Sequence, residues 1–301
     1  MKTIFIFLLT IIFSNSIFAQ CSDAGICIIG KKHGNDLNKN TGSFSVGYIF
    51  GATGKPDDIK IHTFRIEGDV GFAKVHRVGV SIPFGIYSGK GLSNSGIGDL
   101  SVVYSYHLQL QKMVGLTFSL GGKFATGKSN NDDSLSLAYQ PGLGTNDLLI
   151  GAGLTYKNYN FAIGYQKPFG RSKNYSLINS QLKRGDDIFL RAGINETFNK
   201  INLKAEVLAI KRLGKSNIFV DTASSTTTDD EGGTTAGYYT DVNGSNEAQI
   251  NILGTFTYKA SKSVDIQIQI AKAMLQRDFN LDGLKRNFTI GLSLIYNFSR
   301  K

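Results

Sequence analysis

The stretch IGDLSVVYSYHLQL, residues 97–110, alternates apolar and polar side chains along almost its whole length. One face carries Leu100, Val102, Tyr104, Tyr106, Leu108 and Leu110, and the other carries Asp99, Ser101, Ser105, His107 and Gln109. Val103 is the one apolar side chain on the polar face. A period of two is that of a β-strand whose two faces meet different surroundings. The stretch therefore predicts a strand with one apolar and one polar face.

The same alternation recurs along the rest of the chain. It predicts about twelve strands, near residues 42–51, 60–72, 76–84, 97–110, 112–125, 146–157, 160–168, 186–198, 200–212, 247–260, 262–274 and 287–299. An even number of strands with alternating faces is typical of a single-chain bacterial outer-membrane barrel. We therefore expect an all-β fold, a transmembrane antiparallel up-and-down β-barrel.

The predicted connections differ in length in a regular way. Short ones alternate with long ones rich in Gly, Ser, Asn and Asp, at 52–59, 85–96, 126–145, 169–185, 213–246 and 275–286. Outer-membrane barrels have short periplasmic turns and long external loops, so both termini are expected in the periplasm. The stretch Asp221–Asn246 has few apolar residues and no periodicity, which predicts a mobile outer loop or a receptor or adhesion surface.

Aromatic residues separate a membrane barrel from a soluble sandwich. Phe50, Phe84 and Phe124 would mark the outer boundary of the membrane, and Phe72, Tyr156, Phe161, Phe198, Tyr258, Tyr296 and Phe298 the periplasmic one. The alternative is that they are ordinary core aromatics. Because lipid offers no hydrogen bonds, a sheet in the membrane must close and leave no edge. The polar faces would then converge inside the barrel.

The N-terminus has the pattern of a secretory signal. Lys2 precedes an apolar run from Ile4 to Phe13, and small and polar residues lead to Ala19, so we expect Sec-type export with cleavage after Ala19. The alternatives to a cleaved signal are that the segment is a membrane anchor, or that the chain is a lipoprotein modified at Cys21. The expected domains are a signal peptide at 1–19, a periplasmic segment or lumen plug at 20–41, and an outer-membrane barrel at 42–301.

Charge and cysteine content narrow the partners. The formal net charge is +10, but the basic residues are dispersed, which argues against nucleic acid as a partner. The two cysteines, Cys21 and Cys27, could form a disulfide in an oxidising periplasm or remain as thiols. The histidines lie at spacings that do not converge on a metal. No metal and no cofactor are expected.

Four short motifs carry a family resemblance. HRVGVSIPFG at 76–85, SNSGIGDLSVVYSYHL at 93–108, FATGK at 124–128 and QPGLGTND at 140–147 resemble the outer-membrane family named for the meta-pathway of phenol degradation. The resemblance implies a transporter or channel for small, often aromatic or hydrophobic compounds, similar in outline to the outer-membrane fatty-acid transporters. Its partners would be outer-membrane lipid, the barrel assembly machinery and a small solute.

Charged residues on the predicted inner face are the candidate site. They are Arg65, Glu67, Arg77, Asp99, His107, Lys123, Asp147, Arg191, Lys204, Glu206 and Asp265. They would tune which solute passes, or merely brace the barrel by cross-strand ion pairs. An adhesion or structural protein is the alternative function. An outer-membrane lipase is the third, but no lipid-facing Ser and His are adjacent, so no enzyme is expected.

Overall fold

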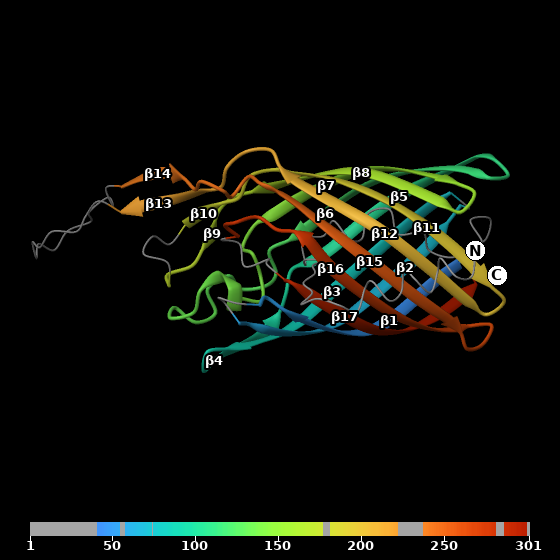
Figure 1. Cartoon of the computed structure of the whole chain (residues 1–301), viewed down its shortest axis with the longest axis horizontal. Coiled ribbons are helices and arrows are strands. Elements are labelled where there is room, and N and C mark those ends of the chain that lie inside the picture. The colour runs from blue at the N-terminus through green and yellow to red at the C-terminus, as the bar shows by residue number, and fades with distance from the viewer. Residues whose placement is uncertain are drawn as a thin grey trace, which may run out of the picture.

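The computed structural model describes residues 41–54, 58–73, 75–176, 181–221, 237–280 and 286–299. Within them one antiparallel sheet closes into a barrel (Figure 1). Its twelve strands are β1 (Thr41–Ala52), β2 (Lys60–Phe72), β3 (His76–Gly89), β5 (Leu100–Gln111), β6 (Val114–Phe124), β7 (Asn146–Tyr156), β8 (Tyr159–Phe169), β11 (Asp187–Phe198), β12 (Ile201–Arg212), β15 (Ala248–Lys259), β16 (Val264–Leu275) and β17 (Phe288–Ser299). Their bounds lie close to those that the alternation predicts.

Closure joins the first strand to the last. Thr41 of β1 is opposite Ser299 of β17, and Ala52 is opposite Phe288, so the two strands pair along their whole length. Each of the twelve strands pairs antiparallel with its two neighbours around the barrel, and β2 pairs with both β1 and β3. Every edge within this ring is paired, which is the requirement for a sheet surrounded by lipid.

The two ends of the barrel differ in their connections. At one end, here called the turn end, short connections at 73–75, 112–113, 157–158, 199–200 and 260–263 join the strands, and Thr41 and Ser299 lie beside each other. The opposite end, here called the loop end, carries every long connection between the twelve strands. Figure 1 shows β4, β9, β10, β13 and β14 gathered there. The predicted asymmetry is confirmed.

Two predictions about the long connections are wrong. Residues 85–96 are not a loop, because β3 continues to Gly89 and pairs with β4 (Leu92–Ile97). Lys90 and Gly91 both have positive φ, 50° and 76°, which is the backbone of a tight two-residue hairpin turn. The stretch from Asp221 to Asn246 is not a loop throughout, since β13 (Asn217–Asp221) pairs with β14 (Gly237–Asp241).

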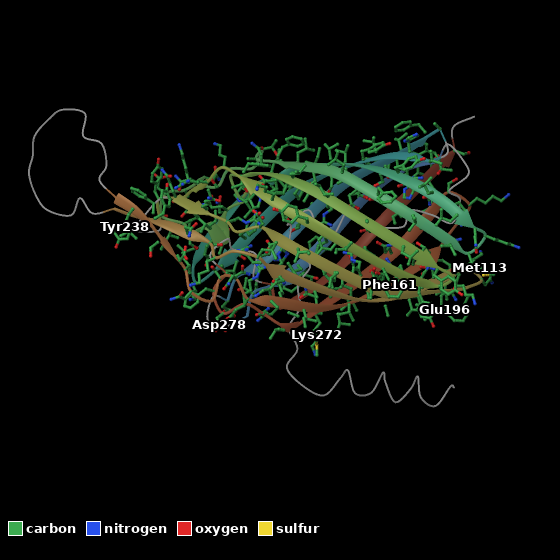
Figure 2. All side chains as sticks on the ribbon, turned by 90° about the horizontal axis from the view of Figure 1, so that it is seen from above. Met113, Phe161, Glu196, Tyr238, Lys272 and Asp278 are labelled. Carbon is green, nitrogen blue, oxygen red and sulfur yellow. The ribbon has the colours of Figure 1, made fainter. Side chains whose placement is uncertain are left out.

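The outward face of the barrel is apolar, as the alternation predicts. On β17 the exposed side chains are Ile290, Leu292, Leu294, Tyr296 and Phe298, while the residues between them are shielded. Aromatic rings are exposed at both ends, including Phe84 and Phe124 at the loop end and Phe72, Tyr156 and Phe198 at the turn end. Figure 2 shows side chains covering the outer wall, with Phe161 among them. Such a surface suits lipid rather than water.

Helices contribute almost nothing to the described residues. The one helical element given there is the short 3₁₀ turn η2 (Leu137–Tyr139), in the connection between β6 and β7. No helix in these residues has the length and hydropathy needed to cross a membrane. The predicted signal peptide, the segment at 20–40, and both Cys21 and Cys27 lie outside the described residues.

Candidate functional site

The interior of the barrel toward its turn end is lined by small and polar side chains. Inward positions on β1 and β17 include Ser45, Gly47 and Ser293, and a Cβ added at Gly47 would lie 2.6 Å from the Ser293 hydroxyl. Across β5 and β6, Ser105 and Ser119 share a hydrogen bond of 3.0 Å. Small hydroxyl-bearing residues leave room inside the barrel and offer hydrogen bonds to water or to a passing solute.

A buried ion-pair network lies at the loop end of the interior. The ammonium group of Lys123 lies 3.3 Å from Asp99 and 3.2 Å from Asp147, and its side chain is 1% exposed. Asp147 also accepts from Arg184 at 3.1 Å and from Thr145 at 2.7 Å. Three candidates from the sequence, Asp99, Lys123 and Asp147, are therefore joined in one cluster.

The same network extends around the barrel through Asp187, at the start of β11. Its carboxylate accepts from Arg212 at 2.9 Å and from Arg277 at 2.8 Å, and Arg184 approaches it to 3.9 Å. The alternation of the sequence does not point to these arginines, because Arg184 and Arg277 lie in long connections and Arg212 ends a strand. Only the folded loops bring them to the acidic residues of the barrel.

Besides its ion pair with Lys123, Asp99 accepts hydrogen bonds from the backbone of a long connection. It lies just before β5, outside the barrel strands, and accepts the backbone N–H groups of Gly127 and Leu143 at 3.1 and 3.0 Å. Burial raises the pKa of the Asp99 carboxyl, while Lys123 and the two N–H donors lower it. Asp99 therefore holds two segments of the connection between β6 and β7 at the loop end.

Two further ion-pair groups lie inside the barrel, one toward the turn end and one near the middle of the strands. Arg77 donates from Nε to Asp69 at 2.9 Å, across β2 and β3. On β12, the Glu206 carboxylate lies 2.8 Å from Lys204 and 3.9 Å from the buried guanidinium of Arg191. Arg191 is opposite Leu208 and Glu206 is opposite Leu253, so charged groups lie at several levels of the interior.

The remaining candidates from the sequence occupy the same inner face. Arg65 lies 3.8 Å from Glu67 on β2, and His107 hydrogen-bonds the Thr117 hydroxyl at 2.8 Å. Asp265 accepts from Asn297 at 2.9 Å, between β16 and β17. The eleven candidates therefore do not form one site.

An apolar cluster inside the barrel was missed by the sequence analysis. Buried side chains from six strands and one connection meet there, namely Val103, Leu143, Leu149, Phe189, Leu208, Ile210, Leu253 and Ala271. Phe189 is 1% exposed and packs where Gly164 of β8 leaves space, since a Cβ at Gly164 would overlap its ring. Val103, the exception in the alternation of residues 97–110, belongs to this cluster. Apolar residues at inward positions of the predicted strands could have indicated this cluster from the sequence.

The connection between β6 and β7 folds against the loop end of the barrel. Its buried Leu135 and Tyr139 pack with Ile59, Ile61 and Tyr87 in a second apolar cluster. The Tyr139 hydroxyl donates to the Gly89 carbonyl at 2.9 Å, and Asn174 donates to the Leu135 carbonyl at 3.0 Å. This connection therefore packs against the loop end and is fixed there by specific hydrogen bonds.

The histidines on the outward face contact tyrosines. His62 and His76, both on the outward face, hydrogen-bond the hydroxyls of Tyr48 and Tyr104 at 2.7 and 2.6 Å. Neither bond joins a histidine to a serine, as a lipase would require. No group of three or more metal-ligating side chains occurs within the ranges that the structure describes.

The closed ring, the apolar outer wall and the polar inner wall define a transmembrane β-barrel protein. No family model matches the chain, and no curated protein matches it. Among solved structures, an outer-membrane channel from Pseudomonas putida F1 aligns over 89% of this chain and 100% of its own, with 14% identity and a TM-score of 0.63. A monoaromatic hydrocarbon channel aligns over 95% and 94%, with 10% identity and a TM-score of 0.50. At these identities the likeness establishes the fold alone.

Proposed function

We propose that the chain is an outer-membrane channel for small molecules, of an aromatic or otherwise hydrophobic kind, and a member of the family that its four motifs resemble. The single observation that carries the proposal is that the side chains inside the barrel change from polar to apolar along its axis. Small polar side chains toward the turn end give way to the apolar cluster around Phe189 and Leu149, which is packed to 1% and 0% exposure beside the buried ion-pair network of the loop end. Apolar walls with a few placed charges favour hydrophobic ligands that bear a polar group.

Orientation follows from the two kinds of connection. Short turns and both barrel termini would lie in the periplasm, and the long connections outside the cell. A solute would then meet the connection between β6 and β7 first, pass the apolar cluster, and reach the polar half of the barrel. The two solved structures named above are both described as channels, which supports a role in passage.

The test is uptake by liposomes that contain the folded protein. Aromatic acids should enter faster than sugars of similar size, because the apolar cluster favours them. Phe189→Ala should raise uptake several-fold by widening the cluster, whereas Phe161→Ala, which removes an aromatic ring from the outer wall, should leave uptake unchanged. Folded protein that admits no solute would refute the channel. Faster entry of sugars would refute the solute class.

One observation favours a second candidate function, binding at the cell surface. A small sheet of β9 (Ser172–Lys173), β10 (Gln181–Lys183), β13 and β14 extends from the loop end (Figure 1). Its Tyr238 ring is 58% exposed, and the Arg171 guanidinium lies 3.4 Å from the centre of the Tyr239 ring. Saturable binding to cells that is lost in Tyr238→Ser, with no solute uptake, would favour an adhesion protein.

A further inference from the structure

Charged residues on the outward face of the barrel strands are few and unevenly placed. Lys60, Lys167, Lys211 and Lys272 lie toward the loop end, and Glu196 lies toward the turn end. Figure 2 shows Lys272 and Glu196 well apart along the barrel. The strand segments between these two levels carry no outward charge in the part of the chain described. The outer wall therefore has a cationic level near the loop end alone.

Two of the four lysines are already engaged. Lys167 lies 4.0 Å from Asp186, and the Lys211 ammonium donates to the Asn246 carbonyl at 2.6 Å. Lys60 and Lys272 have neither an ion pair nor a side-chain hydrogen bond within the described residues. An ammonium group beside lipid without a counter-charge is unfavourable, and long lysine side chains extend toward the interface to reach one.

Strand register places these two lysines in one row. Lys60 of β2 is opposite Ala52 of β1, Ala52 is opposite Phe288 of β17, and Phe288 is opposite Lys272 of β16. Three strand spacings separate the lysines, which corresponds to about 14 Å. Between the two lysines the row holds the small side chain of Ala52 and the partly exposed ring of Phe288, and both ammonium groups can reach one ligand that lies over these two side chains.

The surface on the turn-end side of this row is apolar and aromatic. The next outward row consists of His62, Phe50, Ile290 and Ile270. The His62 ring is held by the Tyr48 hydroxyl and lies 5.2 Å from the Phe50 ring, measured between centroids. A ligand on this patch would meet two cations at the membrane surface and hydrocarbon below them.

We propose that Lys60 and Lys272 bind the phosphorylated glycolipid of the outer leaflet, whose disaccharide head carries a phosphate group at each end and whose acyl chains extend into the bilayer. One phosphate pairs with each lysine, and the acyl chains lie on Ile290, Ile270 and Phe50. Lysine binds phosphate as a compact point charge without demanding one geometry. Asp58, an exposed acidic residue two positions before Lys60 in the sequence, would compete with the phosphate for this lysine.

The location of this row near the membrane surface agrees with the energetics. A lysine on the lipid face costs about 2–4 kcal/mol at the bilayer midplane but only about 0–1 kcal/mol near the interfaces. Lys60 and Phe288 begin their strands at the loop end, and Ala52 ends its strand there. This inference depends on the proposed outer-membrane location and orientation, and it does not depend on whether any solute passes.

Binding of purified lipid A to the folded full-length protein in detergent tests the proposal. Native mass spectrometry would count bound lipid for the parent, Lys60→Gln, Lys272→Gln and the double variant, against diphosphorylated lipid A, monophosphorylated lipid A and phosphatidylglycerol. We expect at least a tenfold loss of affinity for diphosphorylated lipid A in the double variant. The parent should prefer the diphosphorylated form. Lys167→Gln is the matched control and should bind like the parent.

Several results would overturn the proposal. Equal binding by the parent and the double variant would do so, and so would an equal loss in Lys167→Gln, which would indicate general charge attraction. Lys60→Arg and Lys272→Arg should retain affinity, which separates charge from any effect on folding. Liposome uptake measured on the same variants keeps the two proposals distinct. Parent protein that selects lipid A but admits no solute would refute the channel and leave the lipid site standing.

Discussion

Adjacent residues of β17 offer a direct test of which face meets lipid. Leu294 points outward and is 56% exposed, while its neighbour Ser293 points into the barrel opposite Gly47 and Gln267. The strand has 12 residues, of which Leu294 is the seventh. At about 3.3 Å per residue the strand is about 40 Å long, and a tilt of about 40° gives a span of about 30 Å. Leu294 therefore lies near the bilayer midplane.

Leu294→Lys should consequently cost about 2–4 kcal/mol of stability in lipid, whereas Ser293→Lys at the same depth should cost much less. The difference corresponds to a change of about 30-fold to several hundred-fold in the equilibrium between folded and unfolded protein. The chain contains no tryptophan. The folded fraction in a urea series is therefore best measured from the faster gel migration of unboiled samples.

Similar losses for the two variants would refute the assignment of faces. A larger loss for Ser293→Lys would point to a dry interior and a water-exposed outer wall, as in a soluble barrel. Leu294→Ile keeps the apolar character and the volume, so it should behave like the parent and serves as the control.

Three further predictions concern the interior. Gly164→Ala should cost about 1–3 kcal/mol because its Cβ overlaps the Phe189 ring, and Phe189→Leu in the same chain should restore part of the loss, measured by the same urea series. Asp187→Asn should cost about 3–5 kcal/mol because it removes a charge that pairs with the buried guanidinium groups of Arg212 and Arg277. Lys167→Gln, at an exposed ion pair, should cost less than about 1 kcal/mol, and equal costs would contradict the buried network. Tyr139→Phe removes a hydrogen bond worth about 1 kcal/mol and should raise liposome uptake up to about fivefold, and unchanged uptake would show that this connection does not limit passage.

The fold was predictable because its determinants are local. Whether a residue such as Leu100 or Ser101 faces lipid or the interior depends on its place in a period of two, which a single strand already displays. The lengths of the connections, which distinguish the two ends of the barrel, can also be read locally from the sequence. The hairpin at residues 85–96 was not predicted, because its alternation is weak and its short turn is Lys90–Gly91 rather than a more typical Asn-Gly pair.

The contents of the barrel were decided by the tertiary structure. The sequence identified Asp99, Lys123 and Asp147 as inward charges but could not show that Arg184 joins them, since that arginine comes from a connection with no periodicity. It recorded Val103 as an exception, and only the closed ring brings it together with Phe189 and Leu208. By itself the sequence determined strands, faces and ends, because each depends on near neighbours. Which side chains meet inside depends on strands far apart in the chain and on how the loops fold between them.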